Sequence, residues 1–365
     1  MKKIVAAAAA GLILAGTAFA DVSFSWKRTN IVGGTSKQLD SVERSDCLGL
    51  ELSNDIAGVV FDWDIYENAS KATSKLELDS YYGWMTFGLP VGNLQVTSGK
   101  WSGRYSDRVK SDAGDLDGKY YEAYKLGVMD GIIASDSDNL TDGNMSTVLA
   151  YTLADTLPGT LLVKAGIRAG EYGKYDSQSG FVAEVGYRQE GLINVDVAIK
   201  SPKNKQTIIG AFVSPLMVEN LRATVGFTMG NDDGDSEFAI DARARYAITE
   251  KTAVTGMFNY SSISKEIIKK EANGYTGDDV NSMWTMISVN HVAGDNIRFL
   301  ATLQNTVRDF DADNGYNLTA FTPACEIQIS EKALFTAAFD MRWDNKTPYA
   351  GVGDVSLPIY VTLSL

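Results

Sequence analysis

Apolar and polar residues alternate along most of this chain, and that two-residue period is the feature that most limits its fold. In the segment 57–65 (AGVVFDWDI), Phe61 and Trp63 fall at one parity while Asp62 and Asp64 fall at the other. Successive side chains of a β-strand point to opposite faces, so such a segment forms a strand with one apolar and one polar face. The same alternation recurs at 22–26, 236–248, 332–343 and 355–365.

The lengths of the alternating segments and of their connections indicate where such a sheet lies. Many segments are about 9–11 residues long, the length that a tilted strand needs to cross a bilayer. Short connections, such as 54–55 and 89–92, alternate with long polar ones. The long ones are expected at 31–45, 67–77, 102–145, 170–178, 230–235, 261–279, 306–315 and 343–354.

Short turns at one end and long loops at the other are typical of outer-membrane β-barrels. We count about eighteen strands, with sixteen as the alternative, and no run of about 18 apolar residues follows residue 20, which excludes a helical membrane protein. Because lipid offers no hydrogen-bond partners, the sheet must close, with its apolar face toward lipid and its polar face around a lumen. The sequence therefore predicts an all-β, transmembrane antiparallel β-barrel of about 16–18 strands.

Aromatic residues near the ends of the predicted strands suit the two membrane–water interfaces, where Trp and Tyr are enriched. The alternative for each ring is ordinary packing within the sheet. The candidates for interfacial girdles are Trp26, Trp84, Tyr187, Trp284 and Trp343.

The first twenty residues have the pattern of a secretory signal peptide. Lys2 and Lys3 precede an apolar run, and 18–20 (AFA) is a small-residue cleavage site. We expect residues 1–20 to be removed and 21–365 to form a single barrel in the bacterial outer membrane. The net charge of −13 excludes nucleic acid as a default partner, because phosphate binding needs a basic face.

The stretch 81–101 contains a strand, a short turn with Gly92, and a strand that ends in Gly99-Lys100. This arrangement resembles the fourth and fifth strands of general bacterial porins. The stretch 144–167 (NMSTVLAYTLADTLPGTLLVKAGI) resembles the strand, Pro-Gly turn and strand that follow the third loop of porins.

The resemblance implies that 102–145 folds back into the barrel as the constriction loop and narrows it. Porin constrictions set acidic loop residues against basic residues of the wall, and charged rings in a pore tune ion selectivity. The acidic candidates of the loop are Asp112, Asp115, Asp117 and Glu122. The basic candidates of the wall occupy strand positions on the predicted polar face, which lines the lumen: Lys27, Lys164, Arg168, Arg188, Arg243, Arg245, Arg298 and Arg342. The alternative is a solvated external loop whose acids keep the surface soluble.

Other chemistry has little support in the sequence. The acidic stretches 231–237 and 309–317 could bind Ca²⁺ loosely through carboxylate oxygens, although acidic turns are common, and we expect no other cofactor or metal. Cys47 and Cys325 are the only cysteines, and we expect both to be free. The single histidine, His291, lies at a strand end without an identifiable nucleophile, so we expect no enzymatic activity.

The sequence therefore predicts an outer-membrane porin through which small hydrophilic solutes and ions diffuse passively. A homotrimer surrounded by outer-membrane lipid follows from the resemblance alone. The alternative is a barrel-based surface structural protein or adhesin with little channel activity.

Overall fold

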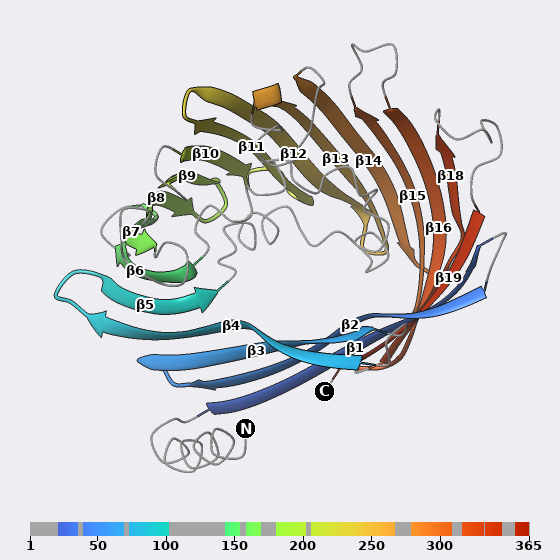
Figure 1. The fold of residues 1–365 in the computed structure, drawn as a ribbon, viewed down its shortest axis with the longest axis horizontal. Coiled ribbons are helices and arrows are strands. Elements are labelled where there is room, and N and C mark those ends of the chain that lie inside the picture. The colour runs from blue at the N-terminus through green and yellow to red at the C-terminus, as the bar shows by residue number, and fades with distance from the viewer. Residues whose placement is uncertain are drawn as a thin grey trace.

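The computed structural model describes residues 21–35, 39–68, 73–101, 143–153, 158–168, 180–201, 206–266, 279–308, 316–331, 333–344 and 355–364. Most of these residues are β-strand, and the strands form one antiparallel sheet curved into a ring (Figure 1). No helix in the described part of the chain is long and apolar enough to cross a membrane.

The strands have the following bounds. They are β1 (Asp21–Thr35), β2 (Leu39–Ser53), β3 (Ala57–Asn68), β4 (Thr73–Gly88), β5 (Asn93–Trp101), β6 (Gly143–Leu153), β7 (Thr160–Arg168), β8 (Gly180–Gln189), β9 (Ile193–Ser201), β10 (Gln206–Pro215), β11 (Leu221–Asp232), β12 (Asp235–Thr249), β13 (Thr252–Ile263), β14 (Val280–Val292), β15 (Ile297–Arg308), β16 (Tyr316–Ser330), β17 (Ala333–Ala338), β18 (Asp340–Asp344) and β19 (Val355–Ser364).

Hydrogen-bonded pairing runs around the whole ring. Each strand from β1 to β16 pairs with the next one along the chain, and β19 pairs with β1 in a register that sets Lys27 beside Ser364. The strands β17 and β18 are two parts of one strand, divided at Phe339, and both lie between β16 and β19. In the described part of the chain the ring thus contains eighteen strands, which agrees with the predicted fold and with the upper value of its strand count.

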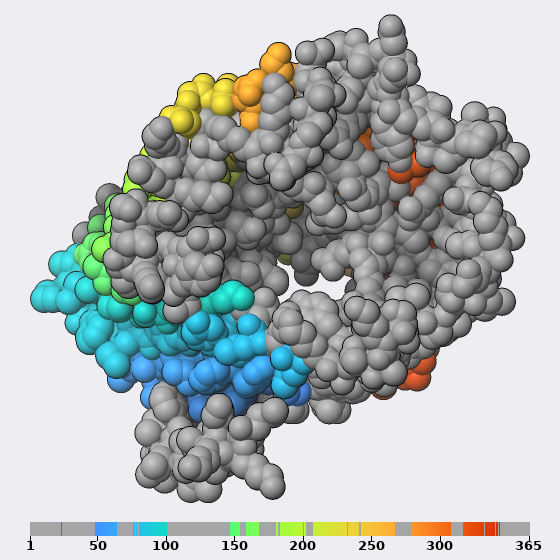
Figure 2. Space-filling view, in the orientation of Figure 1, coloured from blue at the N-terminus to red at the C-terminus, as the bar shows by residue number. Residues whose placement is uncertain are grey.

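The two parities of each strand differ in burial as the sequence predicted. In β13 and β14 nearly every second residue is buried. The exposed parity carries large apolar side chains such as Phe227, Val225 and Ile287, the last of which is 57% exposed. The buried parity carries many polar side chains, including Thr255 and Thr302. In a closed barrel the exposed parity is the convex outer surface, so the outer face is apolar and the inner face is largely polar. Figure 2 shows part of this wall, β2 to β5, as a curved surface at the lower left.

Several strands extend farther than the sequence predicted, and the connections at that end are correspondingly shorter. The long connection expected at 31–45 is largely strand, because β1 continues to Thr35 and β2 begins at Leu39. The connection expected at 67–77 shortens in the same way between β3 and β4. These strand ends lack the regular apolar alternation of the wall, because a strand that projects beyond lipid needs no apolar face.

The connection between β11 and β12 is also shorter than predicted. The expected loop 230–235 is a two-residue turn, Asp233-Gly234, with φ of 57° and 102°. Positive φ at both central residues suits the right-handed twist of a hairpin, and Asp-Gly is a favoured pair for it. The acidic stretch 231–237 therefore folds as the tip of a hairpin.

Two of the expected girdle residues lie on the inner face, so that prediction was wrong for them. Trp284 is 6% exposed and packs with Met257 and Met286. Trp84 lies against Gly58, where an added Cβ would be 2.7 Å from the indole Nε1. Aromatic character alone does not determine parity, which depends on strand register. Tyr187 and Trp343 do have the outer parity, and the side chain of Trp26 is outside the described part.

Candidate functional site: the inner face of the wall

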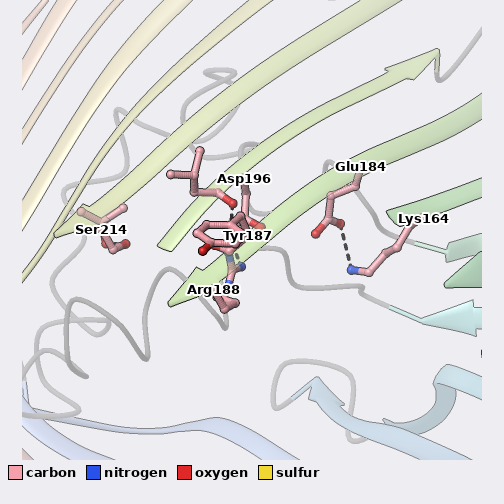
Figure 3. A network of polar contacts seen from close by, with 8 residues as sticks. Lys164, Glu184, Tyr187, Arg188, Asp196 and Ser214 are labelled. Atoms are coloured by element: carbon pink, nitrogen blue, oxygen red, sulfur yellow. Dashed lines mark hydrogen bonds and ion pairs between the residues drawn. The ribbon is translucent and has the colours of Figure 1, made fainter. Parts of the chain in front are cut away.

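Ion pairs between neighbouring strands cross the inner face. The register of β7 and β8 sets Lys164 directly opposite Glu184. The Lys164 Nζ donates to Glu184 Oε2 at 2.8 Å (Figure 3). Opposite charges at directly facing positions are the favourable arrangement for cross-strand pairs.

A second ion pair joins β8 to β9 beside the first. The Arg188 Nη2 donates to Asp196 Oδ2 at 2.5 Å, and Arg188 Nη1 donates to the carbonyls of Tyr187 and Val195, both at 3.0 Å. Gly186 makes room for this arrangement, because a Cβ there would lie 2.6 Å from Asp196 Oδ1. The guanidinium is therefore held against the wall by three contacts (Figure 3).

A third pair joins β15 to β16, where Arg298 directly faces Glu326. The Arg298 Nε donates to Glu326 Oε2 at 2.6 Å, and Nη2 contacts the same oxygen. Two donors on one carboxylate oxygen fix the direction in which the guanidinium points.

The three pairs share an unequal burial of their partners. The carboxylate side chains of Glu184, Asp196 and Glu326 are 0%, 5% and 1% exposed. The basic side chains of Lys164, Arg188 and Arg298 are 21%, 20% and 31% exposed. What remains accessible at each pair is thus the cation.

Arginines also gather on β11 and β12. Arg222 and Arg245 are directly opposite each other, and Arg243 faces Thr224 one step along the same ladder. Thr224 is 1% exposed, which places this parity on the inner face. Sequence reasoning missed Arg222, although its parity, opposite to that of the apolar residues Val225 and Phe227, could have identified it.

Acids that are not fully buried also lie on the inner face: Glu237 on β12 has the same parity as Arg243 and Arg245, and two more lie on β2 and β3. Glu51 on β2 is exposed, and Asp62 on β3 accepts a hydrogen bond from Ser80 Oγ at 3.0 Å. In a ring of eighteen strands, β3 and β12 are nine positions apart, so they are opposite each other, as Figure 1 shows. Sequence reasoning placed Asp62 on the polar face but did not single out either acid.

The structure brings together only some of the wall residues predicted from the sequence. Lys164, Arg188, Arg243, Arg245 and Arg298 lie on the inner face of described strands. The other three basic candidates are placed by backbone register only: Lys27 pairs with Cys47, Arg168 with Gly180, and Arg342 with Ala320.

The constriction-loop prediction falls largely outside the described part. The acids Asp112, Asp115, Asp117 and Glu122 are not among the described residues. The strand β6 begins at Gly143, so residues 143–145 belong to the wall, and the connection after β5 ends at 142.

Other candidate chemistry can be assessed in the described ranges. There, no three His, Cys, Asp or Glu side chains gather in a way that could hold a metal ion, and residues 309–315 lie outside those ranges. The His291 Nδ1 and Thr252 Oγ1 are 2.9 Å apart, a cross-strand pair near the short-turn end. Cys325 is free, and Cys47 has no described side chain.

No protein-family model matches the sequence, and no curated protein matches it either. Solved structures do match over nearly the whole chain. The anion-selective porin of Comamonas acidovorans is 13% identical with a TM-score of 0.53, and 94% of this chain covers 99% of that one. A trimer form of OmpT, an outer membrane protein of Vibrio cholerae, is 11% identical with a TM-score of 0.51 at 94% and 99% coverage. OccK10 of Pseudomonas aeruginosa is 10% identical with a TM-score of 0.55 at the same coverage. At these identities the likeness concerns the fold, and this chain has the porin-like fold, a transmembrane antiparallel β-barrel.

Proposed function

We propose that this protein is an outer-membrane channel through which small hydrophilic solutes and ions diffuse passively. The observation that carries the proposal is the opposite character of the two faces of one closed ring. The outer face is apolar, whereas the inner face carries ion pairs and many hydroxyl and amide side chains. Charged side chains are costly against lipid and natural in a water-filled lumen.

The matched structures support both the channel and its location. Two of them are a porin and an outer membrane protein, and their folds resemble this one over 94% of the chain. Export would use the predicted signal peptide at 1–20. A homotrimer is part of the proposal, supported by the trimer form of the Vibrio cholerae protein.

Selection in this channel would rest on width and charge, without catalysis or a cofactor. Residues 102–142, with Asp112, Asp115, Asp117 and Glu122, would narrow the lumen as the constriction loop. The basic side chains of the wall would then face those acids, and small hydrophilic solutes would pass between them.

Conductance of the purified, refolded protein in a planar lipid bilayer tests the proposal. Discrete ion-conducting steps are expected, in multiples of three if the trimer inserts as a unit. The matched control is the same protein without the refolding step, kept in denaturant until it is diluted into the bilayer chamber. A barrel that folds, as judged by heat-modifiable migration and β-type circular dichroism, but passes no current would contradict the channel and favour a structural or adhesive role. Light scattering of the detergent-solubilised protein separately measures the oligomeric state.

A further inference from the structure

Trp84 lies flat against the inner face of the wall, near the short-turn end of β4. It is directly opposite Gly58 on β3. A Cβ added at Gly58 would lie 2.7, 2.8 and 2.9 Å from the indole atoms Nε1, Cε2 and Cζ2. Because these three adjacent ring atoms are at nearly equal distances, one face of the indole covers the glycine. The other face is directed away from the wall, and the side chain is only partly buried.

Tyr82 extends this aromatic surface along the same strand. It is two residues from Trp84 and therefore on the same face of β4, about 7 Å farther along the wall. Tyr82 is also only partly buried, whereas Trp284, on the inner face of β14, is 6% exposed. Of these three rings, a solute in the lumen meets the two on β4. We call Trp84 and Tyr82 the aromatic platform.

Resting on the proposed channel function, we infer that the aromatic platform and the polar side chains beside it form a binding site for neutral sugars that pass through the channel. A sugar ring has a face of C–H groups, which packs on an aromatic ring, and an edge of hydroxyl groups, which need hydrogen-bond partners. Binding sites for small molecules combine these two elements, an aromatic surface and a few placed polar groups.

Uncharged hydrogen-bonding groups lie beside the platform on β4 and β5. Thr97 is directly opposite Trp84, and Gln95 is directly opposite Thr86. The Gln95 Nε2 donates to Thr86 Oγ1 at 3.3 Å, which orients the amide. All three polar side chains are only partly buried. Amide and hydroxyl groups offer both donors and acceptors, and sugar hydroxyls need both.

Carboxylates lie on the other side of the platform, on β2 and β3. Asp62 accepts a hydrogen bond from Ser80 Oγ at 3.0 Å, one same-face step along the ladder from Tyr82. Glu51 is exposed and is directly opposite Val60, which is in turn directly opposite Tyr82. A carboxylate accepts strong hydrogen bonds from hydroxyl groups and repels anions. The surroundings of the platform therefore favour a neutral polyhydroxyl solute over an anionic one.

Block of the ion current by maltotriose in a planar bilayer tests the inference. Polyethylene glycol of similar size is the comparison solute, because it fills the lumen without presenting a sugar face. Maltotriose is expected to reduce the wild-type current saturably and beyond the effect of polyethylene glycol. Trp84→Ala should raise the concentration for half-maximal block about threefold or more, and Trp84→Phe, which keeps an aromatic ring, should raise it less.

Two further variants separate the platform from general damage to the barrel. Gly58→Ala leaves Trp84 in place but sets a Cβ where the indole lies, so it should displace the ring from the wall and weaken the block. Trp343→Ala is the matched control, because it removes an exposed indole from the outer face, and it should leave the block unchanged. Heat-modifiable migration of each variant shows that the barrel has formed before its current is interpreted.

Calorimetric titration of maltotriose into the detergent-solubilised barrel separates this inference from the function on which it rests. A barrel that passes no current but binds maltotriose, more weakly in Trp84→Ala, supports the site and contradicts the channel alone. A conducting channel that maltotriose blocks no more than polyethylene glycol, or blocks equally in wild type and Trp84→Ala, overturns the sugar site and leaves the channel standing. A folded barrel with neither current nor binding overturns both.

Discussion

Arg222 on β11 and Arg245 on β12 are directly opposite each other on the inner face of the barrel, so two like charges share one rung of the ladder. Sheets usually avoid this arrangement, because facing like charges weaken the pairing of their strands. The facing arginines are therefore expected to cost some stability in the pairing of β11 with β12.

The first prediction concerns that cost. Arg222→Glu should stabilise the barrel by roughly 0.5 kcal/mol, because it converts a repulsive cross-strand pair into an attractive one. Urea unfolding in lipid vesicles, followed by tryptophan fluorescence, measures the change. Arg222→Gln should give about half the effect, and equal stability of all three proteins would contradict the repulsion.

The second prediction concerns the buried partner of Lys164. Lys164→Met should destabilise the barrel by about 2 kcal/mol, because Glu184 would lose a charged partner while its side chain remains buried. Adding Glu184→Gln in the same protein should recover much of the loss. If the double variant is no more stable than Lys164→Met, then the ion pair is not the source of the effect.

The third prediction concerns the contact between Gly226 and Phe212 on the inner face. A Cβ at Gly226 would lie 2.4 Å from the Phe212 ring, so Gly226→Ala should cost about 1–3 kcal/mol through overpacking. Gly256→Ala is the matched control, because a Cβ added at Gly256 would have no atom within 4 Å other than those of the residues next to it in the chain. Phe212→Leu should relieve the cost of Gly226→Ala, and thermal unfolding of the variants beside the wild type measures both effects.

The fourth prediction tests the lipid-facing surface. Ile287, near the middle of β14, is 57% exposed on the outer face, and Ile287→Lys should destabilise the barrel by about 2–4 kcal/mol. Ile329→Lys, close to the short-turn end of β16, should cost at most about 1 kcal/mol, because lysine there reaches the interface. Equal costs at the two depths in lipid vesicles would contradict a membrane-spanning outer face.

Much of the wall was predictable because one physical rule governs it: alternating apolar and polar residues give a strand one apolar and one polar face. The alternation around Phe61 and Asp62 predicts an outer and an inner face, and both faces are found. The prediction failed where that rule does not apply. Residues 31–35 and 39–45 are strand without an apolar face, and Asp233-Gly234 is a tight turn within an acidic stretch that resembled a loop.

The inner face was less predictable because its contacts cross between strands. Trp284 packs with Met257 and Met286, although its position near a strand end suggested the membrane interface. The partner of Arg298 is Glu326, on the neighbouring strand. Such pairs depend on strand register and turn length, which a single alternating pattern does not specify.

The sequence by itself determined that this chain forms a transmembrane antiparallel barrel, because strands with one apolar face and no spanning helix can satisfy their backbone hydrogen bonds in lipid only by closing into a ring. Only the tertiary structure decided which charges meet. Register set Arg222 against Arg245 and Lys164 against Glu184, and the number of strands in the ring set Asp62 across the barrel from the arginines of β12. Those relationships arise from pairing and closure between distant segments, whereas the alternation that specifies the strands acts over a few residues.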